Sequence, residues 1–142
     1  MDPTSLEFWE WFYEPASQGA AMSAEERRRA AEDRWQPDLV LIQSAEMPGT
    51  AGEFHGYEGL AAANRELYES WERIDWNPVD VQALGEDRYL VLLETSGRSR
   101  SGVELGGRGG ELGHIVTLRD GKAARLDTYL GWDTARAAAG LG

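Results

Sequence analysis

Apolar and polar residues alternate along the second half of the chain, whereas the first half shows helical spacing. The alternating segments, which predict β-strands, are 79–84, 89–95, 112–118 and 122–130. Helical spacing covers about 4–14, 23–34 and 57–73, with an apolar strand at 39–43 and a short helix at about 132–139. Helices followed by antiparallel strands predict an α+β domain, in which about three helices pack over a curved, mostly antiparallel sheet and a short C-terminal helix follows.

The hairpin at 112–130 carries the main candidate chemistry. It turns at Arg119-Asp120-Gly121, a glycine-bearing sequence typical of such turns. A two-residue loop would place His114 opposite Asp127, whereas a three-residue loop places it opposite Leu126 and separates apolar from polar residues. We therefore predict the three-residue loop. His114 is then the one titratable side chain on the apolar face, with Thr128 close by on the second strand.

Local signals predict where the helices begin and end. Pro15 is expected to stop the first helix, because proline disfavours helical geometry in the residue before it. Ser23-Ala24-Glu25-Glu26 is a capping-box pattern that predicts the start of the second helix. Residues 35–38 are expected to break that helix before the strand at 39–43. Gln43, which ends this strand, is the first polar residue expected to point inward, and Trp71 is placed in the third helix.

Composition narrows the classes of partner. The 142 residues are expected to form a single domain over 1–142. The formal net charge of -11 would repel nucleic acid and anionic lipid, so neither nucleic acid nor membrane is an expected partner. There is no cysteine, which excludes disulfides and a cysteine nucleophile. With neither an apolar run of about 20 residues nor a signal sequence, we expect a soluble, cytoplasmic protein. No nucleotide fingerprint or metal-ligand cluster occurs, so no cofactor and no metal are predicted.

Several motifs together resemble a known family. They are Pro37-Asp38-Leu39-Val40-Leu41, the FHGYEGL sequence at 54–60, Trp71-Glu72, and the HIVTLRDGKAARLDTYL sequence at 114–130. This chain is similar to SnoaL-like proteins, relatives of ketosteroid isomerase in the nuclear transport factor 2-like superfamily, over about 35–141. The resemblance implies a cone-shaped fold, a ligand-binding pocket, cofactor-independent chemistry and a homodimer. The fold hosts polyketide cyclases, isomerases and proteins with no activity, so it does not identify the reaction.

The resemblance can be carried over one position at a time. His114 matches an active-site histidine of the polyketide cyclases, but their catalytic aspartate corresponds to Thr128 here. The proton-shuttling aspartate of the isomerase corresponds to Gln43, which cannot shuttle protons. The isomerase's tyrosine falls near Phe12 or Tyr13. Two carboxylate positions are thus occupied by groups that do not titrate.

Two functions remain open from these residues. The first is an enzyme that acts on an apolar or polycyclic carbonyl compound as an isomerase, cyclase, lyase or hydrolase, with His114 as catalytic acid or base, because burial lowers the pKa of an imidazole and leaves it neutral. The second is a non-catalytic binding or accessory protein for a hydrophobic ligand, which the missing carboxylates favour. The predicted substrate-binding residues are Trp9, Phe12, Tyr13, Gln43, Trp71, Leu126, Thr128 and Leu130.

Other candidates receive smaller roles. Glu46 and Glu94 are reserve bases, while His55, just ahead of the third helix, is expected at the surface. The aromatic residues of the first helix are expected to fill core or a subunit contact at least as readily as a pocket. The polar hairpin face suits a two-fold homodimer contact; its residues are Arg119, Arg125, Asp127 and Tyr129.

Overall fold

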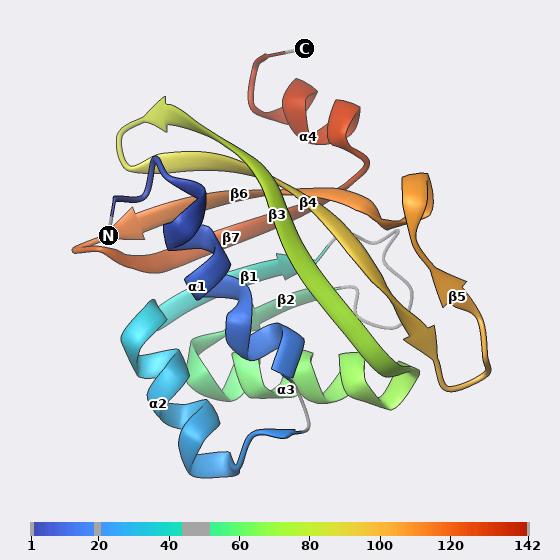
Figure 1. Cartoon of the computed structure of the whole chain (residues 1–142). Coiled ribbons are helices and arrows are strands. Elements are labelled where there is room, and N and C mark those ends of the chain that lie inside the picture. The colour runs from blue at the N-terminus through green and yellow to red at the C-terminus, as the bar shows by residue number, and fades with distance from the viewer. Residues whose placement is uncertain (1, 19–20, 44–51, 142) are drawn as a thin grey trace.

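One curved sheet, with seven strands among the described residues, forms the frame of the protein (Figure 1). The computed structural model describes residues 2–18, 21–43 and 52–141. The strand order is β2-β1-β7-β6-β4-β3, with β5 paired to β4, and every pair is antiparallel except β1 with β7. The strands are β1 (Trp35–Gln43), β2 (Gly52–His55), β3 (Trp71–Gly85), β4 (Arg88–Ser99), β5 (Glu104–Leu105), β6 (Glu111–Arg119) and β7 (Lys122–Leu130). The predicted curved, mostly antiparallel α+β architecture is confirmed.

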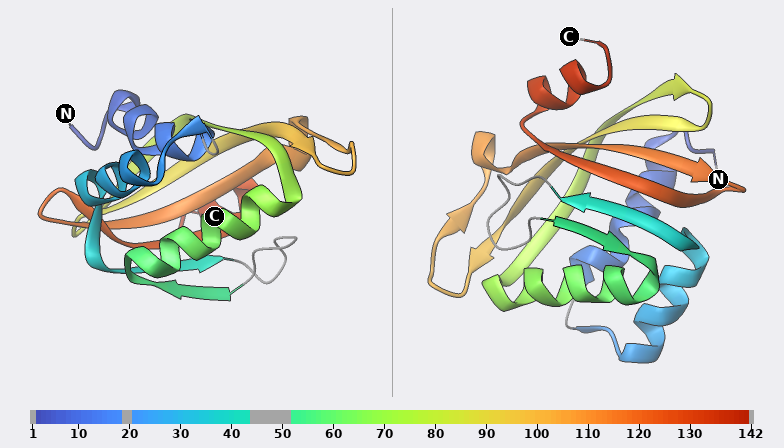
Figure 2. Two further views of the ribbon diagram at one scale, coloured as in Figure 1. Left: turned by 90° about the horizontal axis from the view of Figure 1, so that it is seen from below. Right: turned by 180° about the vertical axis from the view of Figure 1, so that it is seen from behind.

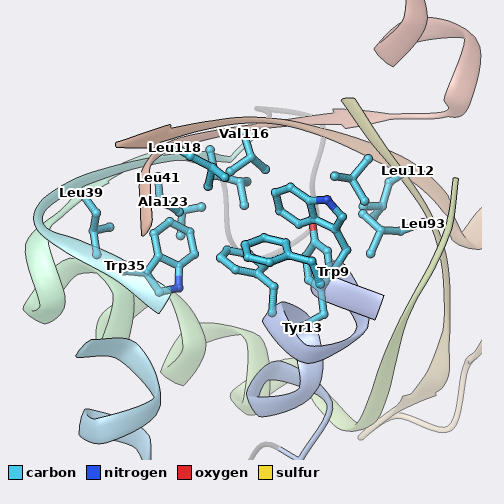
Figure 3. Close-up of a cluster of buried hydrophobic side chains, with 14 of the residues drawn as sticks. Trp9, Tyr13, Trp35, Leu39, Leu41, Leu93, Leu112, Val116, Leu118 and Ala123 are labelled. Atoms are coloured by element: carbon cyan, nitrogen blue, oxygen red, sulfur yellow. The ribbon is translucent and has the colours of Figure 1, made fainter. Parts of the chain in front are cut away.

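In the described part of the chain, four α-helices lie on two sides of this sheet. They are α1 (Leu6–Gln18), α2 (Ala24–Arg34), α3 (Gly56–Ser70) and α4 (Trp132–Ala138). The first three lie on one face, which we call the inner face, and α4 lies near the C-terminus on the other (Figures 1 and 2). Within the described residues, none of the helices has the length and apolar character needed to cross a membrane. The main core lies between α1 and the inner face, where Trp9 and Tyr13 project toward β6 (Figure 3).

The first helix continues through Pro15, so the prediction that this proline ends the helix is wrong. Proline lacks a backbone N–H, and in a helix this leaves the carbonyl four residues earlier without its usual donor. That carbonyl belongs to Trp11, and Arg34 of α2 donates its Nε–H to it at 3.0 Å. The same guanidinium lies over the Trp11 ring, 4.1 Å from its centre. A side chain distant in sequence thus replaces the missing hydrogen bond, which no local pattern reveals.

Two further boundaries differ from those expected. The capping box at Ser23 and Glu26 begins α2 as predicted, but β1 follows directly at Trp35, with no break over 35–38. Pro37 lies inside β1, at the point where the register with β7 shifts between Trp35 and Val40. Proline is tolerated at such irregularities because its missing N–H is not needed for pairing there. Helix α3 ends at Ser70, and Trp71 is the first residue of β3. Trp71 fits both the helical spacing of α3 and the alternation of β3, so periodicity alone assigned it to the wrong element.

The hairpin has the predicted faces but not the predicted loop. Arg119 pairs with Lys122 across a two-residue loop, whose Asp120 and Gly121 have φ of 53° and 79°. The register then shifts by one residue, so that His114 lies opposite Thr128 and not opposite Leu126. The short loop and the one-residue bulge together keep the apolar side chains of both strands on the same face of the sheet. The inner face of the hairpin is therefore apolar apart from His114 and Thr128, as the pattern indicated.

The outer face of the sheet is partly covered, which the sequence did not predict. Helix α4 packs over Leu90, Leu92 and Ile115. A Cβ built on Gly113 of β6 would lie 2.3 Å from the Cβ of Ala135, so only glycine allows this close approach. The polar hairpin face proposed as a homodimer contact therefore shares its side of the sheet with α4.

We predict that Arg34→Gln destabilises the protein through the Trp11 carbonyl. This carbonyl is part-buried, so the loss of its donor should cost about 1 kcal/mol, the lower end of the range for buried groups. Adding Pro15→Ala restores a backbone N–H four residues after Trp11, so Arg34→Gln should cost clearly less in the Pro15→Ala background. Urea denaturation of the wild type, both single variants and the double variant measures this coupling.

The control is Arg28→Gln on the same helix, where Arg28 makes only an exposed pair with Glu32. That change should alter the free energy of unfolding by less than about 0.5 kcal/mol. An equal cost of Arg34→Gln in both backgrounds would contradict the assigned contact.

Candidate functional site

A cavity of about 120 Å³ lies between the helices and the inner face of the sheet. We call it the inner cavity. Its sheet side is formed by Leu41, Gln43, Trp76, His114 and Leu126. Its helix side is formed by Phe12, Tyr13, Pro15 and Ala16 of α1, by Arg27, Ala30, Ala31 and Arg34 of α2, and by Leu60, Ala63, Asn64, Leu67 and Tyr68 of α3; Trp35 completes it.

The inner cavity has a buried floor and a more exposed mouth. His114 and Leu126 of the sheet are buried, whereas Arg27 of α2 is exposed and Asn64 of α3 is half-buried. The cavity therefore opens between the helices, and the sheet closes its inner end. Hydrogen bonds hold the helices at the mouth, since the Tyr68 hydroxyl donates to the Ala16 carbonyl and Arg34 donates to α1.

His114 and Tyr13 form a hydrogen-bonded pair at the floor. The Tyr13 hydroxyl lies 2.7 Å from His114 Nδ1, and each side chain is only 4% exposed. The two rings are tilted by 32° with centroids 5.6 Å apart, and Trp76 lies 5.9 Å from the imidazole on a similar tilt. Helix α1 thus places its phenol against a strand residue about a hundred positions later in the chain. The resemblance had left Phe12 and Tyr13 open, and the structure brings Tyr13 to the histidine.

Burial shifts the pKa values of this pair in opposite directions. Burial lowers the pKa of His114 to about 3, because it removes the water that would stabilise the imidazolium. The same loss of solvation raises the pKa of Tyr13 well above its ordinary value. Both side chains are therefore uncharged at neutral pH, as the sequence predicted for the histidine.

The hydrogen bond also indicates which nitrogen of His114 carries the proton. A protonated phenol is a good donor, and His114 Nδ1 is the partner of the Tyr13 hydroxyl. We therefore assign Nδ1 as the acceptor, which leaves the hydrogen of the neutral imidazole on Nε2. Nε2–H is then a donor that a bound molecule can use.

Three buried polar atoms near the floor have no hydrogen-bond partner among the described residues. They are Gln43 Oε1, Trp76 Nε1 and Thr128 Oγ1. Gln43 and Trp76 line the inner cavity, and Thr128 lies opposite His114 in the β6–β7 pair. Buried polar groups are nearly always satisfied, so Gln43 Oε1 and Trp76 Nε1 mark places in the cavity where a ligand or water would form hydrogen bonds.

The structure brings together some of the predicted site residues and separates others. Phe12, Tyr13, Gln43, His114 and Leu126 line the inner cavity, whereas Trp9, Trp71, Thr128 and Leu130 do not. Trp9 lies in the core with its indole N–H bonded to the Pro3 carbonyl, Leu130 packs against that core, and Trp71 is half-buried at the start of β3.

The reserve candidates lie outside this cavity or cannot be placed. Glu94 is exposed on β4, His55 is exposed beside Glu53, and Glu46 lies outside the described residues. No cluster of three histidine, cysteine or acidic side chains within the described ranges could hold a metal ion.

Sequence reasoning missed the contributions of α2, α3 and β3. Arg27, Ala30 and Arg34 lie three and four positions apart, so they share one face of α2, and this spacing could have identified them. Most of the other residues in this helix are charged, so the positions that face the cavity do not stand out from those that face solvent. Trp76 lay in a stretch with no clear period, and only the pairing of β3 with β4 places it at the cavity.

The sequence matches no protein-family model and no curated protein. Solved structures match nearly the whole chain. An NTF2-like protein of unknown function from Burkholderia pseudomallei has a TM-score of 0.72 at 18% identity, covering 96% of this chain and 95% of that chain. TerC, co-crystallised with polyporic acid, has a TM-score of 0.71 at 17% identity, covering 94% and 96%. A hypothetical protein with a ketosteroid isomerase-like fold from Catenulispora acidiphila, in complex with trimethylamine, has a TM-score of 0.67 at 11% identity, covering 98% and 96%.

These matches identify the fold. The chain has the nuclear transport factor 2-like α+β cone fold, with a mostly antiparallel sheet that is not closed. A SnoaL-like polyketide cyclase from Jannaschia is also among the matching structures. The resemblance in fold that the sequence motifs indicated is therefore confirmed.

We predict that His114 makes the protein less stable below neutral pH. Its folded pKa of about 3 lies below the ordinary value of 6.5, so the unfolded chain binds a proton that the folded chain excludes. Stability from this group is complete above about pH 6.5 and falls as pH drops toward 3. Between pH 8 and pH 5 the loss should be about 2 kcal/mol.

His114→Gln removes this titration and retains a group that can bond to Tyr13. Urea denaturation at both pH values should show a smaller loss for this variant than for the wild type. His55→Gln, at the exposed histidine, should keep the wild-type loss. Equal losses in all three proteins would show that His114 is not held neutral.

Proposed function

We propose that the inner cavity binds a small carbonyl compound with an apolar body, and that His114 donates its Nε2–H to the carbonyl oxygen. The observation that carries this proposal is the buried His114–Tyr13 pair at the end of a cavity. Small-molecule sites are concave, mostly apolar and supplied with a few polar groups that orient the ligand. The matching structures with polyporic acid and trimethylamine support a small-molecule site in this fold.

The chemistry we propose is stabilisation of an enolate-like oxygen. A neutral imidazole that donates a hydrogen bond favours the negative charge that develops on a carbonyl oxygen during isomerisation, elimination or cyclisation. Tyr13 holds the imidazole in the tautomer that makes this possible. Gln43, at the same floor, would orient the oxygen-bearing end of the ligand.

A second candidate function is non-catalytic binding of a hydrophobic ligand. It is favoured by the absence of carboxylates from the described lining, since Gln43 and Thr128 stand where the related enzymes have aspartates. It is also favoured by the pKa of His114, because a base with a pKa of about 3 has little tendency to remove a proton at neutral pH. A homodimer remains part of the proposal, on the resemblance and on the polar hairpin face, and a cytoplasmic location remains an expectation from the sequence.

We predict that acetophenone and acetonaphthone bind to the wild-type protein and that His114→Leu weakens binding by about tenfold. The loss of one hydrogen bond in a buried site accounts for this factor. Quenching of tryptophan fluorescence measures the dissociation constants, and Trp76 at the cavity provides the signal. His55→Gln should bind both ketones as the wild type does.

Turnover separates the two candidate functions. Transfer of the protein and ketone into heavy water allows the exchange of acetyl hydrogens for deuterium to be followed by NMR. If the enolate is stabilised, a base from the solvent removes the acetyl proton, and deuterium from heavy water replaces it, faster with the wild-type protein; His114→Leu abolishes this acceleration. Binding without acceleration in either protein would support the non-catalytic function, and no binding of either ketone would contradict both.

A further inference from the structure

The charged side chains that line the inner cavity are all arginines within the described residues. The chain has 25 acidic and 14 basic residues, yet the lining contains Arg27 and Arg34 and no carboxylate. The protein as a whole is negatively charged, whereas two guanidinium groups make the lining of this cavity positively charged. Such a cavity attracts anions and repels cations.

Arg34 is held in place by contacts that leave its charge unpaired. Only 9% of the residue is exposed, and its Nε and Nη1 groups donate to the carbonyls of Trp11 and Ala30 at 3.0 and 3.2 Å. Stacking on the Trp11 ring orients the plane of the guanidinium. Neither Arg34 nor Arg27 makes an ion pair within the described part of the chain, although the exposed Glu14 and Asp33 act on Arg34 from farther away.

One nitrogen of Arg34 remains available for a ligand. Nη2 has no hydrogen-bond partner in the described ranges and is not among their buried unpartnered atoms. Arg27 lies seven residues, or two helical turns, before Arg34 on the same face of α2. Its own Nε and Nη2 donate to the Met22 carbonyl at 3.1 and 2.9 Å. The half-buried Asn64 of α3 adds an amide at the mouth. Two oriented cations with an adjacent amide are well suited to a carboxylate.

The floor has a different chemistry from the mouth. Trp76 Nε1 is an unpartnered donor, and the assigned tautomer gives His114 a second donor at Nε2. Both are neutral, so they suit a carbonyl or hydroxyl oxygen better than a full negative charge. Between floor and mouth the lining is apolar, with Phe12, Leu60 and Leu126 among its residues.

We propose that the inner cavity takes a carboxylic acid that has a compact apolar body and a carbonyl oxygen at its far end. The carboxylate binds Arg34 at the mouth, assisted by Arg27, and the carbonyl oxygen reaches His114 and Trp76 at the floor. This inference rests on the proposed function and specifies its substrate class. It excludes neutral ketones and organic cations as preferred ligands.

The test compares three probes with one body and different charge. They are para-acetylbenzoate, its methyl ester, and para-acetylphenyltrimethylammonium, and isothermal titration calorimetry of the full chain gives each dissociation constant. The acid should bind at least about tenfold more tightly than the ester, because a charge-assisted hydrogen bond in a sheltered site is stronger than a neutral one. The cation should bind more weakly than the ester, and added salt should weaken only the acid.

Arg34→Gln should remove the advantage of the acid over the ester and leave the affinity for the ester within about twofold. Since this variant also releases the Trp11 carbonyl, the same comparison is made in the Pro15→Ala/Arg34→Gln protein, where that carbonyl regains a donor. Arg34→Lys should retain part of the preference. Arg28→Gln, whose side chain pairs with Glu32 at the surface, is the matched control and should bind all three probes as the wild type does.

The outcomes separate this inference from the proposed function. Equal affinity for acid and ester, tighter binding of the cation, or a preference unchanged by Arg34→Gln would overturn the carboxylate site and leave the carbonyl site intact. If none of the three probes binds, the proposed function fails and this inference fails with it.

Discussion

The hydrogen bond between Tyr13 and His114 is the interaction on which the account of this molecule depends. It joins the first helix to the middle of the sheet, at a depth where both partners are almost free of solvent. It satisfies one nitrogen of the imidazole and leaves the other for the cavity. Because burial disfavours both the imidazolium and the phenolate, the pair remains neutral.

Helix α1, which carries Tyr13, continues past Pro15 and is supported at that point by α2. If α1 ended at Pro15, its last turn could not follow the inner face and reach β3, where Ser17 accepts a hydrogen bond from the Trp76 N–H. Arg34 makes the longer helix possible by bonding to the carbonyl that proline leaves free. The same guanidinium borders the cavity, so one residue stabilises the wall and gives the mouth its charge.

Features set by neighbouring residues could be predicted from the sequence, whereas features set by contacts between distant parts of the chain could not. Alternation identified the faces of the hairpin correctly, since burial sorts side chains with a period of two whatever the turn. The loop itself was mispredicted because a two-residue turn and a bulge near Ala124 together restore the same alternation, and no local pattern distinguishes that solution from a three-residue loop. His114 and Gln43 were found at the cavity from their strand positions and the resemblance. Arg34 and Trp76 were not, because their inward orientation follows from contacts with α1 and β4 that are remote in sequence. Arg27 was missed although it shares one face of α2 with Arg34.

His114 should be a neutral imidazole with its hydrogen on Nε2, a state that nitrogen NMR of the imidazole ring observes without perturbing the protein. In protein labelled with nitrogen-15, the two ring nitrogens of His114 should show the shifts of a neutral ring, with the protonated nitrogen at Nε2, unchanged between about pH 8 and pH 5. His114→Gln identifies the signals by their loss. A resonance that titrates near the ordinary histidine pKa, or a hydrogen on Nδ1, would contradict the account.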